Sequence, residues 1–145
     1  MAWPADLRTL TPCPNFADGA SEVDLVAAET RLGLKLPPHL RELLAHTDGL
    51  TGEYDLSLVW PLQRIIGDNL HFRAYPEFKT LYMPFDCLLF FSDAGNGDQF
   101  AYTIAGGEVR RPDIFVWNHE DDSRAWVSSS LRSFLPDWIS GKLAV

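Results

Sequence analysis

The chain has 145 residues, of which 46% are hydrophobic and 22% charged, a composition that suits one globular domain with its own core. It excludes a disordered tail, a collagen-like repeat and a charged coiled coil. The longest apolar run, Cys87–Phe91, is far shorter than the roughly 20 residues of a membrane span, and the N-terminus has no signal-like apolar core. We therefore expect a soluble, cytoplasmic protein.

The formal net charge is −8, from 12 basic and 20 acidic residues. An acidic surface repels nucleic-acid phosphates and anionic lipids, so we expect neither a nucleic-acid nor a membrane partner. It attracts basic proteins through long-range steering. The alternative interpretation is that the charge only maintains solubility.

The first half of the chain predicts an arm followed by two helices. Residues 1–20 contain three prolines and several turn residues, which indicates an irregular N-terminal arm before a single domain over residues 21–145. Ser21 is placed to cap a first helix that Gly33 ends. Its buried stripe is predicted at Val23, Val26, Ala27, Thr30 and Leu34.

A Leu-Pro elbow at Leu36-Pro37-Pro38 separates this helix from a second one, because proline fits the first turn of a helix. Gly49 is a natural terminator just beyond the second helix. Its buried face is predicted at Leu40, Leu43, Leu44 and Thr47.

The second half predicts an antiparallel sheet and a closing helix. Alternating or wholly apolar runs indicate strands over residues 54–60, 88–91, 99–104 and 114–117, and a short helix over residues 62–70. After Ser123 the helical period returns, with one face formed by Trp126, Val127, Ser130, Leu131, Phe134, Leu135 and Trp138. The fold class is therefore α+β, with two N-terminal helices and a C-terminal helix packed on an antiparallel sheet.

No motif predicts catalysis, a metal site or a cofactor. The sequence lacks a phosphate loop, a nucleophile elbow and a His-Glu-x-x-His zinc pair. The turn Asp93–Asp98 places oxygen side chains at its first, fourth and sixth positions, unlike a calcium loop. The run His119–Asp122 has two interpretations: a metal-dependent hydrolase site that also uses Asp93 and Asp98, or a cap on the C-terminal helix. We favour the cap and expect no enzyme activity.

Acidic residues concentrate in one segment of the chain. Residues 81–122 contain eight acids and two arginines, so they carry −6 of the −8 formal charge. Most of these acids fall in predicted turns of one sheet, whereas a merely solvated surface would spread them more evenly. We therefore predict a partner-binding acidic face formed by Asp93, Asp98, Asp113, Glu120, Asp121 and Asp122.

A family resemblance extends through most of the chain. Glu29 in the first helix, then Leu32-Gly33, the Leu36-Pro37 elbow and a second helix that ends at Asp48-Gly49 resemble the N-terminal signature of the SUKH superfamily. Asn-Gly is usual at the last of these positions. Residues 91–102, residues 116–120 and the helix to Trp138 resemble later parts of the signature. The resemblance therefore spans residues 21 to about 140.

This resemblance implies an α+β binding module without enzymatic activity. For bacterial relatives it implies an immunity protein, which binds and silences a toxin, and for eukaryotic relatives a regulator of cell-wall synthesis and signalling. With the acidic segment, it leads us to expect a protein partner, a basic toxin domain such as a nuclease. A regulatory scaffold is the alternative, and the sequence leaves the partner's identity and the oligomeric state open.

Overall fold

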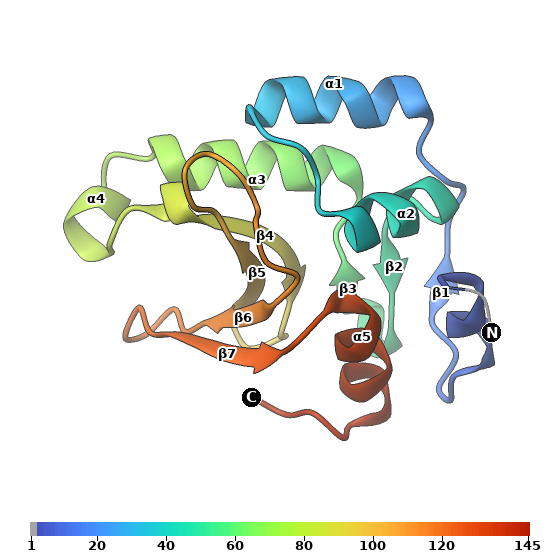
Figure 1. Cartoon of the computed structure of the whole chain (residues 1–145). Helices are drawn as coiled ribbons and strands as arrows, with labels where there is room; N and C mark the ends of the chain where they lie inside the picture. The colour runs from blue at the N-terminus through green and yellow to red at the C-terminus, as the bar shows by residue number, and fades with distance from the viewer. Residues whose placement is uncertain (1–2) are drawn as a thin grey trace.

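The chain forms two antiparallel sheets with helices packed around them, and the prediction of an α+β fold is confirmed (Figure 1). The structure is a computed structural model that describes residues 3–145. Its α-helices are α1 (Glu22–Leu32), α2 (Pro38–His46), α3 (Leu62–Ala74), α4 (Phe78–Leu81) and α5 (Leu131–Ser140). Its short 3-10 helices are η1 (Ala5–Thr9), η2 (Glu53–Asp55) and η3 (Phe85–Cys87).

The strands of the described range pair into a three-stranded and a four-stranded sheet, in the orders β1-β2-β3 and β4-β5-β6-β7. The first sheet consists of β1 (Asn15–Phe16), β2 (Leu50–Thr51) and β3 (Ser57–Val59). The second consists of β4 (Leu88–Asp93), β5 (Gln99–Thr103), β6 (Ile114–Trp117) and β7 (Arg124–Ser128). Just after β3, the backbone N–H of Trp60 donates to the carbonyl of Phe91 over 2.7 Å, which ties the two sheets together.

Helices cover both faces of the four-stranded sheet. Phe90 on β4 packs against Phe72 of α3, with ring centroids 5.2 Å apart, whereas its neighbour Phe91 packs 6.1 Å from Phe134 of α5. Successive side chains of a strand point to opposite faces. The unbroken apolar run at the start of β4 therefore reflects burial on both sides, as Figure 1 shows with α3 and α5 on opposite sides of the sheet.

The elbow between α1 and α2 is fixed by a carboxylate. The Glu29 side chain accepts a hydrogen bond from the backbone N–H of Leu36 over 2.8 Å and lies 3.4 Å from the Arg41 guanidinium. The helix ends match the predictions, because the Ser21 hydroxyl accepts from the N–H of Asp24 and Gly33 has a φ of +72°. The acid of the family signature thus orients the second helix relative to the first.

The N-terminal arm packs against the C-terminal end of α2. The Ala17 N–H donates to the Thr47 hydroxyl and the Asp48 N–H donates to the carbonyl of Asp18, both over 2.8 Å. The Asp48 carboxylate in turn accepts from the N–H of Leu62 over 2.7 Å, at the start of α3. Residues 3–20 therefore contribute to the folded unit, through η1 and β1, and the domain boundary at residue 21 stays a prediction.

The predicted buried stripe of α1 is wrong. Val23 is 77% exposed and Val26 49% exposed, and both lie on the outer face of the helix. The buried side chains are Leu25, Ala28 and Leu32, spaced three and four residues apart. Apolar residues lie on both faces of this helix, so their periodicity alone did not identify the face that is buried.

The predicted start of the C-terminal helix is also wrong. Trp126 and Val127 belong to strand β7, which pairs with β6, and α5 begins only at Leu131 after the N-cap Ser130. Without β7 the outer edge of β6 would lack a partner strand. The interpretation of His119–Asp122 as a helix cap therefore fails, because this run forms the turn between β6 and β7.

Two smaller predictions needed adjustment. The strand predicted over residues 54–60 is shorter, because residues 53–55 form η2 and only Ser57–Val59 pair as β3. The helix predicted over residues 62–70 extends to Ala74 as α3.

Candidate functional site

Two turns of the four-stranded sheet lie at the same end of its strands, and His119 of one turn is bonded to Asp98 of the other. The register places Gln99 opposite both Asp93 and Trp117, so the β4–β5 and β6–β7 turns begin side by side. The His119 N–H donates to Oδ1 of Asp98 over 3.1 Å, and Nδ1 of His119 lies 2.6 Å from the same oxygen. Asp98 is only 8% exposed, and its carboxylate holds the two turns together.

Gly97 allows this close approach between the turns. Its φ is +97°, a region that disfavours residues with a Cβ atom. A Cβ at this position would lie 2.7 Å from Cε1 of His119. A side chain at Gly97 would therefore displace the imidazole from Asp98.

Two further predicted acids are held by cations. The Asp93 carboxylate accepts two hydrogen bonds from the Arg64 guanidinium, of 2.7 and 2.9 Å. Asp113 accepts from Arg111 over 3.0 Å and from the indole N–H of Trp126 over 2.8 Å. The Arg111 hydrogen bond, followed by that of Trp126, lowers the pKa of Asp113 below its ordinary value. Both carboxylates are therefore satisfied within the domain.

Asp122 is the most heavily engaged of the predicted acids. Its Oδ2 accepts from the backbone N–H of Met83 over 2.8 Å, and its Oδ1 accepts from the Trp117 indole over 2.8 Å and from Arg124 over 3.0 Å. Burial raises the pKa of Asp122, but these hydrogen bonds outweigh that effect and the pKa is lowered. Asp122 thus connects the β6–β7 turn to the segment before β4.

Glu120 and Asp121 are the two predicted acids that remain exposed at the tip of the β6–β7 turn. The turn is closed beneath them by the Asn118 side chain, which accepts from the Glu120 N–H over 2.8 Å. Oδ1 of Asp121 accepts from the backbone N–H of Ser123, which lowers the pKa of Asp121. Within residues 3–145, the Glu120 carboxylate has no ion-pair partner. These two side chains present negative charge to solvent.

The predicted acidic face is therefore divided in the structure. One end of the strands carries four of the acids: Asp98, Glu120, Asp121 and Asp122. Of these, Asp98 and Asp122 are bound to other residues of the domain. Asp93 is directed to α3 through Arg64. Asp113 lies at the opposite end of the strands, because it directly precedes Ile114, the first residue of β6, which pairs with Ser128 at the end of β7.

Sequence reasoning missed two exposed apolar side chains in the segment that contacts the β6–β7 turn. Leu81 is 66% exposed and Met83 is 58% exposed, where α4 leads towards β4. The intervening Tyr82 hydroxyl donates to the His119 carbonyl over 3.1 Å, which places this segment against the β6–β7 turn. No periodicity marks these residues in the sequence. We call Leu81, Met83, Glu120 and Asp121 together the acid–apolar surface.

Arg124 fixes the segment that carries the apolar side chains. Its guanidinium donates to the carbonyls of Met83 over 3.0 Å and Pro84 over 3.2 Å, and lies 5.3 Å from the centre of the Phe85 ring. With the bond from the Met83 N–H to Asp122, both backbone polar groups of Met83 are bound to the β6–β7 hairpin. The acid–apolar surface is therefore preorganised, which lowers the entropic cost of binding.

The geometry does not support the metal-dependent hydrolase. In residues 3–145, no group of three or more His, Cys, Asp or Glu side chains is arranged to hold a metal ion. Among the same residues, the His119 ring hydrogen bonds with Asp98 alone, so it has an orienting carboxylate but no adjacent nucleophile.

Throughout the described range, the helices are too short or too polar to cross a bilayer. No curated protein matches the chain in a sequence search. The sequence model of the SUKH_6 family, described as SMI1-KNR4 cell-wall, matches residues 22–135. This range extends from the start of α1 into α5 and includes the acid–apolar surface. The chain therefore belongs to the SUKH superfamily, in its SMI1-KNR4 cell-wall family.

Proposed function

We propose that this domain is an immunity-type binding module that neutralises a basic protein toxin in the cytoplasm. SUKH domains are in general non-enzymatic immunity or regulatory modules, which supports a binding role over catalysis. The formal charge of −8 favours encounter with a basic partner.

The observation that carries the proposal is the acid–apolar surface. Protein interfaces take most of their affinity from a few buried apolar anchors surrounded by polar residues. Leu81 and Met83 are apolar anchors left exposed to solvent, and methionine adapts its shape to a partner. Glu120 and Asp121 supply negative charge on the turn that this segment contacts. The four side chains thus match a basic partner that has an apolar recess.

Neutralisation proceeds by occlusion. A nuclease toxin binds phosphate in a cleft lined with basic residues, and exposed carboxylates compete for the same cleft. Glu120 and Asp121 project from a hairpin turn, a shape that can enter such a cleft. Asp98 and Asp122 hold that turn in position, whereas Asp93 and Asp113 are paired with arginines elsewhere in the domain.

A regulatory scaffold in cell-wall synthesis or signalling is the second candidate, favoured by the description of the matched family. It would use the same acid–apolar surface and differ in its partner. Protection against a toxin therefore separates the two functions.

The test first asks whether a gene adjacent to that of this protein encodes a basic toxin domain, and then co-expresses that domain with this chain. We expect the native chain to restore growth, and Glu120→Lys/Asp121→Lys to lose protection. The control variant Glu42→Lys/Glu53→Lys makes the same change of net charge at two exposed acids outside the acid–apolar surface and should protect fully. No protection by the native chain, or equal loss in both double variants, would contradict the proposal.

A further inference from the structure

The outer face of α1 is apolar although it faces solvent, at the top of the view in Figure 1. Val23 is 77% exposed and Val26 49% exposed, and Ala27 and Thr30 are exposed beside them. The Thr30 hydroxyl donates to the carbonyl of Val26 over 3.1 Å, so it is bonded within the helix. These four residues have the i, i+3, i+4, i+7 spacing of a helix face that packs against another element, whereas an exposed face normally carries polar residues.

The two flanks of this apolar stripe differ in how their charges are paired. Glu22 and Glu29 lie seven residues apart, about two helical turns, and so share one flank. Both pair with Arg41 of α2, over 2.7 and 3.4 Å. Asp24 and Arg31 share the other flank by the same spacing, and both are exposed without an ion-pair partner among residues 3–145. This second flank therefore carries an unpaired acid near the start of α1 and an unpaired base near its end.

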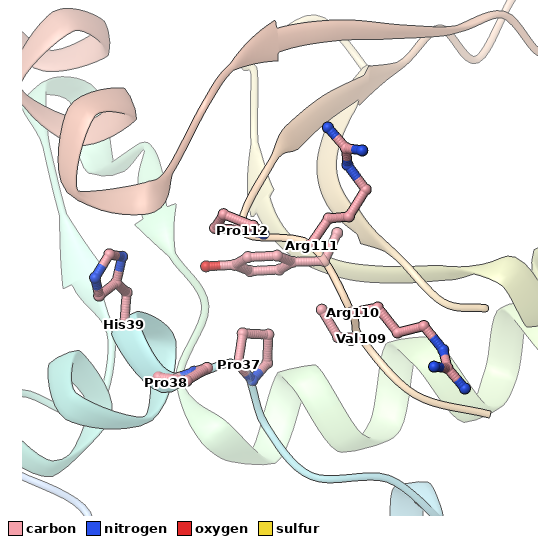
Figure 2. A pocket seen from close by; sticks show the side chains of 8 residues that line it. Pro37, Pro38, His39, Val109, Arg110, Arg111 and Pro112 are labelled. Atoms are coloured by element: carbon pink, nitrogen blue, oxygen red, sulfur yellow. The ribbon is translucent and has the colours of Figure 1, made fainter. Parts of the chain in front are cut away.

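Two other arginines lie close to the Leu-Pro elbow that follows α1, and both are already paired. Figure 2 shows Arg110 and Arg111 in the segment that faces the elbow across a pocket. Arg110 lies 3.2 Å from Glu108, and Arg111 lies 3.0 Å from Asp113. This pocket therefore adds no free positive charge beside α1, and Arg31 differs from these arginines in having no carboxylate partner within the described residues.

We propose that α1 packs against α1 of a second copy of this chain in an antiparallel, two-fold symmetric dimer. Such an axis brings the same flank of both helices together and reverses their direction. Asp24 of each copy then lies beside Arg31 of the other, while the two apolar stripes face each other. A parallel pair would instead place this flank against the one whose carboxylates are already bound to Arg41. The charges therefore favour the antiparallel pair.

The dimer is weak because its interface is small. One face of an 11-residue helix buries less area than the roughly 1,200–2,000 Å² of stable complexes. We expect a dissociation constant of about 0.1–1 mM. Figure 1 shows α1 at the top of the view and the β6–β7 hairpin near the bottom, so the dimer leaves Glu120 and Asp121 exposed. The dimer is thus independent of the proposed toxin binding.

Nuclear magnetic resonance of the full chain between about 0.05 and 2 mM tests the dimer. At about 150 mM salt, repulsion between the two acidic copies is screened beyond roughly 8 Å. We expect concentration-dependent shifts of the Val23, Val26 and Thr30 amide signals, together with slower tumbling. Val26→Lys should remove both effects. The control Val145→Lys changes a valine of similar exposure, 48%, at the opposite side of the molecule, and should leave them unchanged (Figure 1). No concentration-dependent change up to about 2 mM, or shifts centred on another surface, would overturn the proposal.

An exchange of charges tests the antiparallel arrangement. Asp24→Lys and Arg31→Glu should each weaken the dimer severalfold, because each places like charges side by side between the two copies. The double variant Asp24→Lys/Arg31→Glu restores opposite charges and should recover the dissociation constant of the native chain to within about twofold. Within one chain the two residues are about two turns apart, so the exchange would not reverse an effect confined to the monomer. A double variant that dimerises as weakly as the single variants would overturn the proposal.

Discussion

Replacing Asp122 by asparagine tests whether this acid holds the fold. Asp122 has a φ of +62°, a left-handed conformation that asparagine also tolerates, so the variant removes the charge and keeps the backbone. One amide oxygen can accept two of the three hydrogen bonds now made by Met83, Trp117 and Arg124, but the amide N–H₂ then faces the remaining donor.

The expected loss is about 2 kcal/mol of unfolding free energy at pH 7. A hydrogen bond to a charged group contributes roughly 1.5–3 kcal/mol, and the two hydrogen bonds that remain to the neutral amide are weaker than those to the carboxylate. The Asp122 side chain is only 14% exposed, so solvent screens these interactions weakly. Urea denaturation measures the loss as a shift of the midpoint of about 1 M, with a slope in the usual range of 1–3 kcal/mol/M. Asp121→Asn, at the exposed neighbour, is the matched control and should change stability by less than about 0.5 kcal/mol.

The difference between the native chain and Asp122→Asn should also depend on pH. The pKa of Asp122 is lowered in the folded state, so the ionised carboxylate stabilises the fold above the ordinary pKa of 3.8. This contribution is lost as the pH falls through the folded-state pKa, where the native carboxylate becomes neutral like the asparagine. A loss below 0.5 kcal/mol at pH 7, or a difference that grows on acidification, would refute the structural role of Asp122.

Three further substitutions test other parts of the structure. Leu43→Ala on α2 should lower the free energy of unfolding by about 2–5 kcal/mol in urea denaturation, because Leu43 is fully buried, and a loss below 1 kcal/mol would contradict its place in the core. Asn69→Leu should lower it by about 3 kcal/mol, because the buried amide bonds both backbone groups of Phe90 at the irregularity in β4, and an unchanged urea midpoint would contradict this. Gly97→Ala should displace the His119 imidazole, and unchanged His119 ring proton shifts would show that the two turns do not depend on the glycine.

Local signals in the sequence predicted the parts of the fold that depend on neighbouring residues. Ser21 caps α1 and Gly33 ends it, since capping is decided within one helical turn. The run from Leu88 to Phe91 predicted a buried strand, because four successive apolar residues fit a strand with both faces covered.

Signals that depend on distant residues were insufficient. Trp126 and Val127 fit a helical period with Leu131, but pairing with β6 makes them part of a strand. Local periodicity does not include the stabilisation that a strand gains from its partner.

The candidate site shows the same limit for charge. Counting residues located the acidic segment, yet counting cannot distinguish Asp93, which is paired with Arg64 from 29 positions away, from Glu120, which faces solvent. Leu81 and Met83 gave no periodic signal, because their exposure depends on how the segment around Tyr82 packs against the β6–β7 turn.

The most direct test of the acid–apolar surface is the association rate of this domain with the purified toxin domain identified by the co-expression test. Stopped-flow measurements would compare the native chain, Glu120→Lys/Asp121→Lys and the control Glu42→Lys/Glu53→Lys between about 50 and 300 mM salt, since salt screens exposed charges over roughly 8 Å at physiological ionic strength. Glu120 and Asp121 are exposed and cap no helix, so the melting temperature should fall by no more than about 4 °C, through loss of the exposed bond from the Ser123 N–H to Asp121. We predict that the first double variant associates at least tenfold more slowly at low salt and that added salt narrows the difference. Equal association rates for the two double variants, or a loss that salt does not reduce, would contradict the account.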